Sequence, residues 1–468
     1  MKVEQIYTGC LAQGAYYIES GGQAAIIDPL RETIPYLKKA EKNEATIKYI
    51  FETHFHADFV SGHVDLARQT GATIVFGPGA ETEYKIHQAK DSEIFELGKV
   101  KIKVLHTPGH TPESVTYLLL DESGKEHAIF SGDTLFIGDV GRPDLAIKSG
   151  LTKEDLAGML FESLRNKILP LPDDVIVYPA HGAGSACGKN MSKETSDSLG
   201  HQKKTNYALR ADMTREEFIK EVTIGILPPP QYFAKNALLN KTGADEFEEI
   251  LQKGSVALDA NTFEALANHE GAMVLDTRSP KAFSEGHIPN SVFVGLDGSF
   301  APWIGALITD LQQPIIFLCQ EGREEEVVTR LSRVGYDNTL GYLKGGIQVW
   351  KEAGKELETI TSIDASEFAK RYTKDLAIAD VRKPSEYEAE HVDGAENVPL
   401  DFINDNMEQL DREKEYYIHC AGGYRSMIFA SILKARGFNK LIDVAGGFKA
   451  ISETSVPKSD YVCPSSLE

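Results

Sequence analysis

The sequence of 468 residues contains few cysteines for its length. The five that it has are widely spaced and odd in number: Cys10, Cys187, Cys319, Cys420 and Cys463. Secreted proteins that depend on disulfides are usually short, with many evenly paired cysteines. A disulfide framework is therefore excluded, and we expect a reducing compartment, the cytoplasm.

The sequence also lacks long apolar runs and an excess of positive charge. No run approaches the roughly 20 apolar residues of a membrane-spanning helix. The first residues, Met1 to Gln5, lead into strand-like sequence without the regions of a signal peptide. The 49 basic and 70 acidic residues give a formal net charge of −21. This balance argues against nucleic acid and anionic membranes as partners.

The length predicts about three domains, because a single hydrophobic core does not grow to this size. Residues 1–250 begin with short β-rich runs separated by glycine and proline turns, and become more helical after about residue 192. We expect a sheet-rich α/β layer domain here. Strands are expected at 24–28, 47–51, 72–76, 100–104 and 114–119.

An internal repeat of about 100 residues follows, which predicts two copies of one α/β domain at 255–356 and 360–468. Asp276-Thr277-Arg278 in the first copy matches Asp380-Val381-Arg382 in the second. The repeat recurs at two further landmarks: Cys319 and Cys420, and the glycine pairs Gly345-Gly346 and Gly446-Gly447.

Histidines and carboxylates cluster after several of the strands expected in the first domain. In chain order the cluster contains His54, His56, Asp58, His110, Asp133 and His181. A single histidine is most often a packing or surface residue, but a whole set at strand ends is typical of a metal site. We therefore predict one metal-binding cleft at an edge of the sheet.

Residues 1 to about 240 resemble the metallo-β-lactamase superfamily, which implies an αββα sandwich. In its dinuclear hydrolases, one metal takes the residues that match His54, His56 and His110. The other takes those that match Asp58, the residue after it and His181, with Asp133 as the bridge. Here the residue after Asp58 is Phe59. An apolar ring in place of an imidazole weakens the two-metal interpretation.

The persulfide dioxygenase branch is the part of the superfamily that this domain resembles most. The motifs are His54-Phe55-His56-Ala57-Asp58, Thr107-Pro108-Gly109-His110 and Gly132-Asp133-Thr134-Leu135-Phe136. The resemblance implies one mononuclear Fe(II) per chain, held by His54, His110 and Asp133 as a 2-His-1-carboxylate triad. His56, Asp58 and His181 would then orient ligands or waters.

Two further residues are weaker candidates for substrate binding in this domain. Arg142 suits a carboxylate or phosphate, and a structural ion pair is an equally good interpretation. Cys187 follows His181 by six residues and is expected near the iron, although a buried, inert thiol is the commoner fate of such a cysteine.

The loop that runs from Cys420 to Arg425 follows a strand expected at 416–419 and precedes a helix expected at 426–433. Backbone N–H groups, the helix N-terminus and Arg425 favour a thiolate and an anionic sulfur adduct. The loop resembles the active loop of rhodanese sulfurtransferases. Cysteine phosphatases have five residues between Cys and Arg, whereas four stand here. In the first copy Glu324 replaces this arginine, so we expect that Cys319 belongs to a degenerate domain.

The whole chain resembles persulfide dioxygenases that are fused to two rhodanese domains. This implies that a thiol persulfide, carried by glutathione, coenzyme A or a similar thiol, is oxidised by O2 to the thiol and sulfite. Cys420 would exchange sulfur among persulfide, sulfite and thiosulfate, in sulfide detoxification. Two alternatives stay open: a zinc thioester hydrolase of glyoxalase II type with sulfur-carrier domains, and a non-enzymatic scaffold. We also expect a homo-oligomer.

Overall fold

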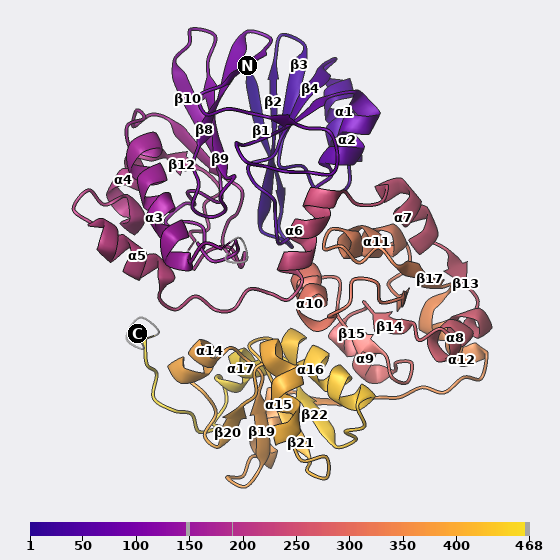
Figure 1. The fold of residues 1–468 in the computed structure, drawn as a ribbon. Coiled ribbons are helices and arrows are strands. Elements are labelled where there is room, and N and C mark those ends of the chain that lie inside the picture. The colour runs from indigo at the N-terminus through magenta and orange to yellow at the C-terminus, as the bar shows by residue number, and fades with distance from the viewer. Residues whose placement is uncertain (147–149, 190, 464–468) are drawn as a thin grey trace. The chain divides into compact units, whose positions relative to one another are not determined.

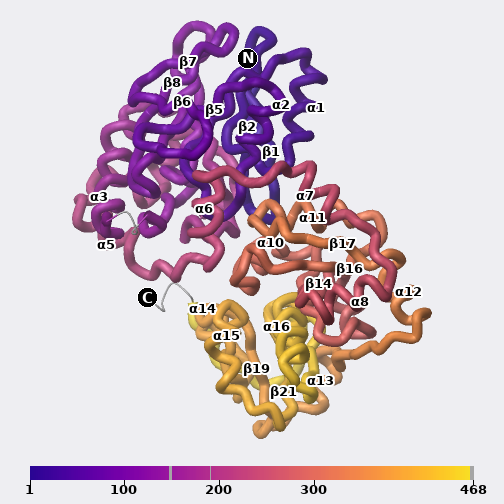
Figure 2. Tube along the Cα trace, turned by 45° about the vertical axis from the view of Figure 1, so that its right-hand side comes forward, coloured from indigo at the N-terminus to yellow at the C-terminus, as the bar shows by residue number. Residues whose placement is uncertain are grey.

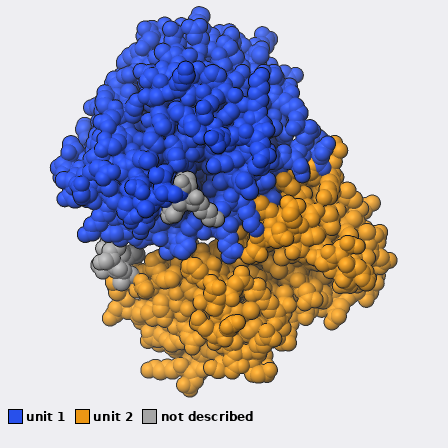
Figure 3. Space-filling view, in the orientation of Figure 1, with its two compact units in different colours: residues 1–249, 331–335 blue, residues 250–330, 336–468 orange. Residues whose placement is uncertain are grey.

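The computed structural model describes residues 1–146, 150–189 and 191–463. The chain divides into two compact units (Figure 3): residues 1–249 with 331–335, and residues 250–330 with 336–468. Within the described residues, no helix is both long enough and apolar enough to cross a membrane.

The first unit contains two six-stranded sheets (Figure 1). In spatial order, one sheet consists of β1 (Lys2–Thr8), β2 (Gln13–Ser20), β3 (Gln23–Ile27), β4 (Thr46–Phe51), β5 (Thr73–Phe76) and β6 (His87–Gln88). The other consists of β12 (Asp197–Ser198), β11 (Ile176–Pro179), β10 (Glu126–Gly132), β9 (Val115–Leu120), β8 (Val100–His106) and β7 (Ile94–Leu97). The strands expected from the sequence in this domain are all present as β3, β4, β5, β8 and β9.

Both sheets are mixed, and side chains from their facing sides form a common apolar core. Strands β3 to β6 are parallel in the first sheet, and β10 pairs with β11 in parallel in the second. Phe51 of β4 and Tyr117 of β9 are fully buried in this core, with ring centroids 4.7 Å apart. Alternation along each strand sends the intervening residues to the outer faces.

Helices cover those outer faces, which confirms the αββα sandwich. The first sheet packs against α1 (Ile34–Lys42) and α2 (His63–Thr70). The second packs against α3 (Lys153–Ser163), a π-helical turn at Leu164–Ile168 and α5 (Arg215–Thr223). The remaining helices are α4 (Leu199–Thr205), a 3-10 turn at Tyr207–Leu209, α6 (Phe233–Thr242) and α7 (Phe247–Gly254). The stretch from about residue 192 to 253 is thus largely helical, as expected.

The second unit contains two five-stranded parallel sheets with the same strand order. In Figures 1 and 2 the chain runs from pink to orange through the first of these domains and from orange to yellow through the second. In spatial order the strands are β13 (Ala257–Leu258), β17 (Thr339–Leu343), β16 (Ile315–Leu318), β14 (Met273–Asp276) and β15 (Val292–Phe293), then β18 (Thr361–Ile363), β22 (Leu441–Val444), β21 (Tyr416–His419), β19 (Ala377–Asp380) and β20 (Ala395–Asn397). The shared order confirms the α/β repeat that the sequence predicts.

Helices cover both parallel sheets, as buried parallel strands require. The first sheet has α8 (Ala260–His269), α9 (Pro280–Glu285), α10 (Phe300–Leu307), α11 (Glu324–Ser332) and α12 (Gly346–Glu352). The second has α13 (Ala365–Arg371), α14 (Pro384–Ala389), α15 (Ile403–Asn406), α16 (Tyr424–Ala435), α17 (Gly447–Ile451) and 3-10 turns at Leu400–Phe402 and Met407–Gln409.

The repeated Asp-x-Arg motif makes the same contacts in both copies. Arg278 bonds to Asp276 at 2.6 Å and donates to the Gly286 carbonyl at 2.8 Å. Arg382 bonds to Asp380 at 2.6 Å and donates to the Glu390 carbonyl, also at 2.8 Å. The Asp–Arg pair therefore connects the end of β14 or β19 to the segment that follows the next helix. This contact gives the motif a structural role.

We expect Asp380→Ala to lower the free energy of unfolding of the second parallel-sheet domain by about 3–5 kcal/mol, because it leaves the buried Arg382 guanidinium without its partner. Glu413→Ala in the same domain removes an ion pair with Lys440 whose carboxylate is 87% exposed, and should cost about 1 kcal/mol or less. Urea denaturation measures both. Equal costs would show that the motif is not a structural tie.

Candidate functional site

Four loops that follow strands of the two sheets carry the candidate metal ligands. His54 follows β4, His110 lies between β8 and β9, Asp133 follows β10 directly, and His181 follows β11. These four side chains are buried, with exposures of 2% or less. The β4 loop belongs to one sheet and the other three to its neighbour, so the site bridges the two layers.

His54, His110 and Asp133 form a compact group whose donor atoms all lie within 4.8 Å of one another. Nε2 of His110 lies 3.4 Å and Nε2 of His54 lies 3.9 Å from the same Asp133 oxygen. Both carboxylate oxygens of Asp133 are buried, and apart from the weak Cys187 thiol they have no hydrogen-bond donor among the described residues. A buried carboxylate is costly unless a positive charge compensates its negative charge, so this group fits a bound cation. Its two imidazoles and one carboxylate are a ligand set that suits Fe(II).

The outer nitrogen of each imidazole in this group is held by a neighbour. Nδ1 of His54 lies 3.0 Å from the Thr53 hydroxyl, which itself donates to Asp28 at 2.9 Å. Nδ1 of His110 donates to the Arg142 carbonyl at 2.8 Å. Both rings thus present Nε2 to the centre. Burial, with the nearby imidazoles, lowers the pKa of His54 well below its usual range, which favours the neutral form that binds metals.

His56, Asp58 and His181 form a second group of buried donors. Nε2 of His181 lies 3.4 Å from Asp58 and 3.6 Å from Asp133. The ring of Phe59 is fully buried and stacks on His56, with centroids 4.3 Å apart. Phe59 therefore occupies the position at which a dinuclear site needs a further imidazole, and it serves there as an aromatic packing residue.

His56 is drawn toward two carboxylates that sequence reasoning missed. Its Nε2 lies 3.1 Å from Asp28 and 3.4 Å from Glu52. Burial lowers the pKa of His56, but these two carboxylates outweigh that effect and raise it to about 9. The position of Asp28 at the end of the strand predicted at 24–28 was a usable signal, since the other site residues also follow strands.

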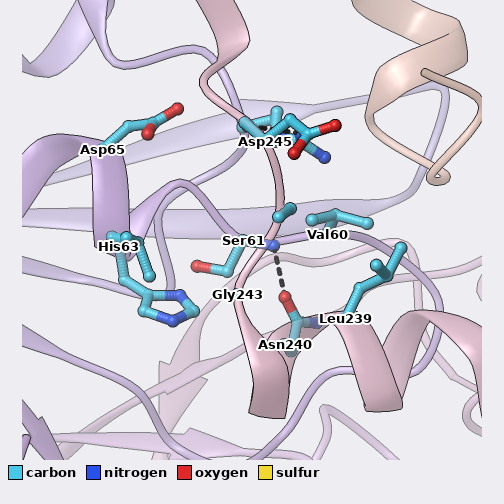
Figure 4. Close-up of a pocket in the computed structure, with 11 residues that line it drawn as sticks. Val60, Ser61, His63, Asp65, Leu239, Asn240, Gly243 and Asp245 are labelled. Carbon is cyan, nitrogen blue, oxygen red and sulfur yellow. Dashed lines mark hydrogen bonds between the residues drawn. The ribbon is translucent and has the colours of Figure 1, made fainter. Parts of the chain in front are cut away.

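Asn240 of α6 fixes the loop behind this second group, and no sequence motif marked it. Its amide nitrogen donates to the carbonyls of His56 and Phe59, each at 2.8 Å. Its oxygen accepts from the Ser61 backbone at 2.9 Å, as Figure 4 shows. Nearly 180 residues of chain separate Asn240 from its partners, so only tertiary structure reveals the contact.

Cys187 lies beside the metal group, where the sequence placed it. Its sulfur is within 4.8 Å of donor atoms of Asp133 and His181, and the residue is 1% exposed. Burial, followed by the charges of Asp58 and Asp133, raises the pKa of the thiol well above its usual range. Cys187 is therefore a neutral thiol at this site.

Arg142 forms the structural ion pair that was one of its two interpretations. Its guanidinium bonds to both oxygens of Asp144 at 2.6 and 2.8 Å, and donates to the carbonyls of Ala186 and Leu227. With these partners, and 8% exposure, it fastens three segments together. The contact between Arg142 and the metal group is made by its backbone carbonyl, which accepts a hydrogen bond from His110, and not by its charged side chain.

The Cys420 loop lies at the end of β21, at the N-terminus of α16. The backbone N–H of Gly423 donates to the Cys420 sulfur at 3.1 Å, and Gly423 has a φ of 93° that favours glycine. Arg425 makes two bonds to Glu386, at 2.7 and 2.8 Å. Backbone and helix N-terminus therefore cradle the sulfur, whereas the guanidinium of Arg425, which the sequence predicts to stabilise a sulfur anion, is paired with Glu386.

The corresponding loop of the first copy opposes a thiolate, as its sequence predicts. Burial, and then the charge of Glu324, raise the pKa of Cys319 to about 12. Arg323, the nearest cation in the loop, is paired with Asp297 at 2.6 Å and with Glu326 at 2.7 Å. The thiol of Cys319 is thus protonated at neutral pH.

Comparison with family models matches residues 8–181 to the metallo-beta-lactamase superfamily, and residues 259–353 and 364–454 to the rhodanese-like domain. The chain is 34% identical over 187 residues to a probable hydroxyacylglutathione hydrolase of Schizosaccharomyces pombe, which covers 39% of this chain and 68% of that protein. The chain belongs to the metallo-beta-lactamase superfamily. This metallo-beta-lactamase domain is followed by two rhodanese-like domains, which confirms the predicted architecture.

Other proteins that are similar to this chain are named for different activities. It is 30% identical over 212 residues to the mitochondrial persulfide dioxygenase ETHE1 of Homo sapiens, covering 45% of this chain and 74% of that protein. A crystal structure of a metallo-beta-lactamase from Staphylococcus aureus matches with 31% identity and a TM-score of 0.64, covering 73% of this chain and 98% of that one. The named hydrolase and dioxygenase are similar to this chain to nearly the same degree, so the site chemistry must distinguish them.

We expect the metallo-beta-lactamase domain to bind one equivalent of Fe(II) after anaerobic reconstitution, because His54, His110 and Asp133 supply a 2-His-1-carboxylate set, whereas Phe59 stands where a second metal would need an imidazole. His110→Ala should reduce the iron content at least tenfold. Phe59→His should raise it toward two equivalents by restoring an imidazole. Elemental analysis measures the iron content, with His201→Ala, a 60% exposed histidine, as the control. Two equivalents in the wild type would contradict the mononuclear assignment.

Proposed function

We propose that the metallo-beta-lactamase domain oxidises a low-molecular-weight thiol persulfide with O2, and that the second rhodanese-like domain transfers sulfur through Cys420. The first reaction converts R–S–SH, O2 and H2O to R–SH and sulfite. Glutathione and coenzyme A are candidate carriers. The few, widely spaced cysteines favour a reducing compartment, the cytoplasm, as the site of this sulfide detoxification.

The observation that carries the proposal is the buried group of His54, His110 and Asp133. Its two imidazoles and one carboxylate are the donor set typical of mononuclear iron oxygenases. These three residues would hold Fe(II), which would supply the redox chemistry for the reaction of a persulfide sulfur with O2. Phe59 and the carboxylates around His56 disfavour a second metal, which a hydrolase of the dinuclear kind uses.

The chain's own residues prepare this centre. The carbonyl of Arg142 and the hydroxyl of Thr53 fix the two imidazoles. Burial excludes bulk water from a persulfide, which protects a reactive intermediate from side reactions. Asp58 and His181, 3.4 Å apart, can hold and move a proton beside the centre, because the reaction consumes water and releases protons.

Cys420 would act as the nucleophile of the second reaction. Its thiolate attacks the outer sulfur of R–S–SH, a new S–S bond forms, and R–S leaves with the electron pair and is protonated. Sulfite then attacks the outer sulfur on Cys420, which forms thiosulfate and releases the thiolate. The Gly423 N–H and the α16 N-terminus stabilise negative charge on sulfur in both steps.

A zinc thioester hydrolase is the second candidate, favoured by the similarity to the hydroxyacylglutathione hydrolases and by the group of His56, Asp58 and His181. It predicts zinc in the isolated protein and hydrolysis of a glutathione thioester. A scaffold without activity predicts that alkylation of Cys420 changes no measurable rate.

We expect the Fe(II)-loaded protein to consume O2 when a thiol persulfide is added, and we expect His110→Ala to reduce the rate at least a hundredfold, because it removes one of three metal ligands. An oxygen electrode measures the rate. Uptake that persists in His110→Ala after its iron content has fallen would contradict the assignment of the centre. The hydrolase candidate would be supported if a thioester were turned over and O2 were not.

We expect Cys420→Ser to leave O2 uptake within about twofold of the wild type but to abolish thiosulfate formation from persulfide and sulfite, because serine cannot form a persulfide. Cys319→Ser is the matched control and should change neither rate, since that thiol is protonated at neutral pH. Thiosulfate can be measured by chromatography under anaerobic conditions. Undiminished thiosulfate in Cys420→Ser would remove the transferase role from this loop.

A further inference from the structure

Helix α16, whose N-terminus cradles Cys420, packs against the first rhodanese-like domain. Its first residue, Tyr424, donates its hydroxyl to the Gly295 carbonyl of that domain at 2.7 Å. Further along the helix, the Ser431 hydroxyl accepts from the backbone N–H of Phe293 in the edge strand β15 at 2.9 Å, and both residues are fully buried. The helix that carries the reactive loop is therefore fastened at two points to the domain whose own thiol is protonated.

Tyr424 is the residue through which this contact reaches the reactive sulfur. It directly follows Gly423, whose backbone N–H donates to the Cys420 sulfur at 3.1 Å. The Tyr424 ring also packs edge-on against Phe293, with ring centroids 6.0 Å apart. Since a peptide chain has only two soft dihedral angles per residue, a displacement of Tyr424 moves the Gly423 N–H relative to the sulfur.

Gly298 of the first rhodanese-like domain makes room for the Tyr424 ring. A Cβ atom at this position would lie 2.3 Å from Cζ of the ring, and its three nearest neighbours would all be ring atoms. Non-bonded carbon atoms pack at about 3.5–4.0 Å, so any side chain here would displace the ring. Gly298 is not among the residues with a positive φ, so its backbone conformation does not itself require glycine.

The second copy of the domain shows that the fold does not need this glycine. The N–H groups of Leu296 and Leu400 each donate to the carbonyl of the middle residue of the Asp-x-Arg motif in their own domain, at 3.0 and 3.2 Å. These equivalent bonds align the two loops and place Phe402 at the position of Gly298. The glycine is therefore matched to the incoming Tyr424 ring and not to the fold of the domain.

The receiving loop, residues 295–298, is held in place within the first rhodanese-like domain. Arg330 of α11 donates to the Leu296 carbonyl at 2.6 Å. Arg323 pairs with the Asp297 carboxylate, also at 2.6 Å. These contacts do not involve the tyrosine, so the receiving loop is an independent support for its ring.

We propose that Tyr424 is a positioning residue for Cys420, and that the receiving loop of the first rhodanese-like domain holds it in place. The phenol hydrogen bond and the space at Gly298 fix the first turn of α16. The Gly423 N–H is thereby aimed at the sulfur, where it stabilises negative charge. The first domain thus supports sulfur transfer by the second. The inference rests on the proposed function, in which Cys420 is the nucleophile.

The test follows the alkylation of Cys420 by iodoacetamide over a range of pH in the full-length protein, because the thiolate is the reactive form. Mass spectrometry of the peptide that contains Cys420 separates this thiol from the other four. We expect Tyr424→Phe to move the midpoint of the pH profile up by about half a unit, and to lower kcat for thiosulfate formation about threefold, because the loss of one hydrogen bond loosens the Gly423 N–H. The KM for the persulfide should stay within about twofold.

Gly298→Ala tests the same contact from the other domain. Its methyl group displaces the ring, so we expect a shift of the pH profile at least as large as that of Tyr424→Phe. Tyr424→Ala removes the ring, so the addition of Gly298→Ala to that variant should cause no further shift. Additive shifts from Tyr424→Ala and Gly298→Ala would overturn the contact.

Each substitution has a matched control. Tyr372 donates its hydroxyl to the Asp393 carbonyl at 2.9 Å in the same domain as Cys420, so Tyr372→Phe removes an equivalent hydrogen bond. A Cβ atom at Gly286 would lie 4.0 Å from its nearest neighbour outside the adjacent residues, so Gly286→Ala adds a methyl group to the first domain without displacing anything. Both controls should match the wild type in pH profile and kcat. Control shifts as large as those of the test variants would overturn the positioning role.

The alkylation profile also separates this inference from the proposed function. A shifted profile in Tyr424→Phe supports the positioning role even if the wild type transfers no sulfur. Sulfur transfer by the wild type, together with identical profiles in the wild type, Tyr424→Phe and Gly298→Ala, would support the proposed function and overturn the positioning role. Because Tyr424→Phe removes a single hydroxyl group, it retains the fold even if Gly298→Ala does not.

Discussion

The metallo-beta-lactamase domain depends on the burial of an uncompensated carboxylate, Asp133, between imidazoles. Strand β10 delivers Asp133 to the end of its sheet, and apart from the weak Cys187 thiol its two oxygens have no hydrogen-bond donor in the part of the chain that the structure describes. A charge in such an environment is costly unless a cation joins it. The loops that carry His54 and His110 are arranged accordingly. A neighbour holds Nδ1 of each of these two rings, which leaves Nε2 for the ion.

The same principle explains why the two halves of the donor cluster differ. His54 and His110 face Asp133, which His181 also approaches at 3.6 Å, whereas His56 faces Asp28 and Glu52 and stacks on Phe59. Two carboxylates beside one imidazole favour its protonated form, which is a poor metal ligand. The local balance of charge, more than the number of histidines, therefore supports the proposal of a single metal ion.

Electrostatics also separates the two rhodanese-like domains, although their strand order and their Asp-x-Arg ties are the same. In the second copy a backbone N–H and a helix N-terminus face Cys420. In the first copy, Glu324 stands at the start of the equivalent helix, where a negative charge beside a thiol raises its pKa. The two domains thus share a fold but differ in the charge around the loop cysteine, because packing and charge are specified by different residues.

The sequence by itself determined the elements and the chemistry of single loops. Alternating apolar runs marked the strands, the recurrence of Asp-x-Arg, cysteine and Gly-Gly marked the repeat, and strand-end histidines and carboxylates marked the metal group. These signals are local, since strand periodicity and loop motifs depend on neighbouring residues. Only the tertiary structure decided which donors face one another, that Asp28 and Glu52 engage His56, that Glu386 holds Arg425, and that Asn240 braces the loop. Those contacts join residues that are mostly far apart in the chain, and burial, which sets their charge states, exists only once the sheets and helices have packed together.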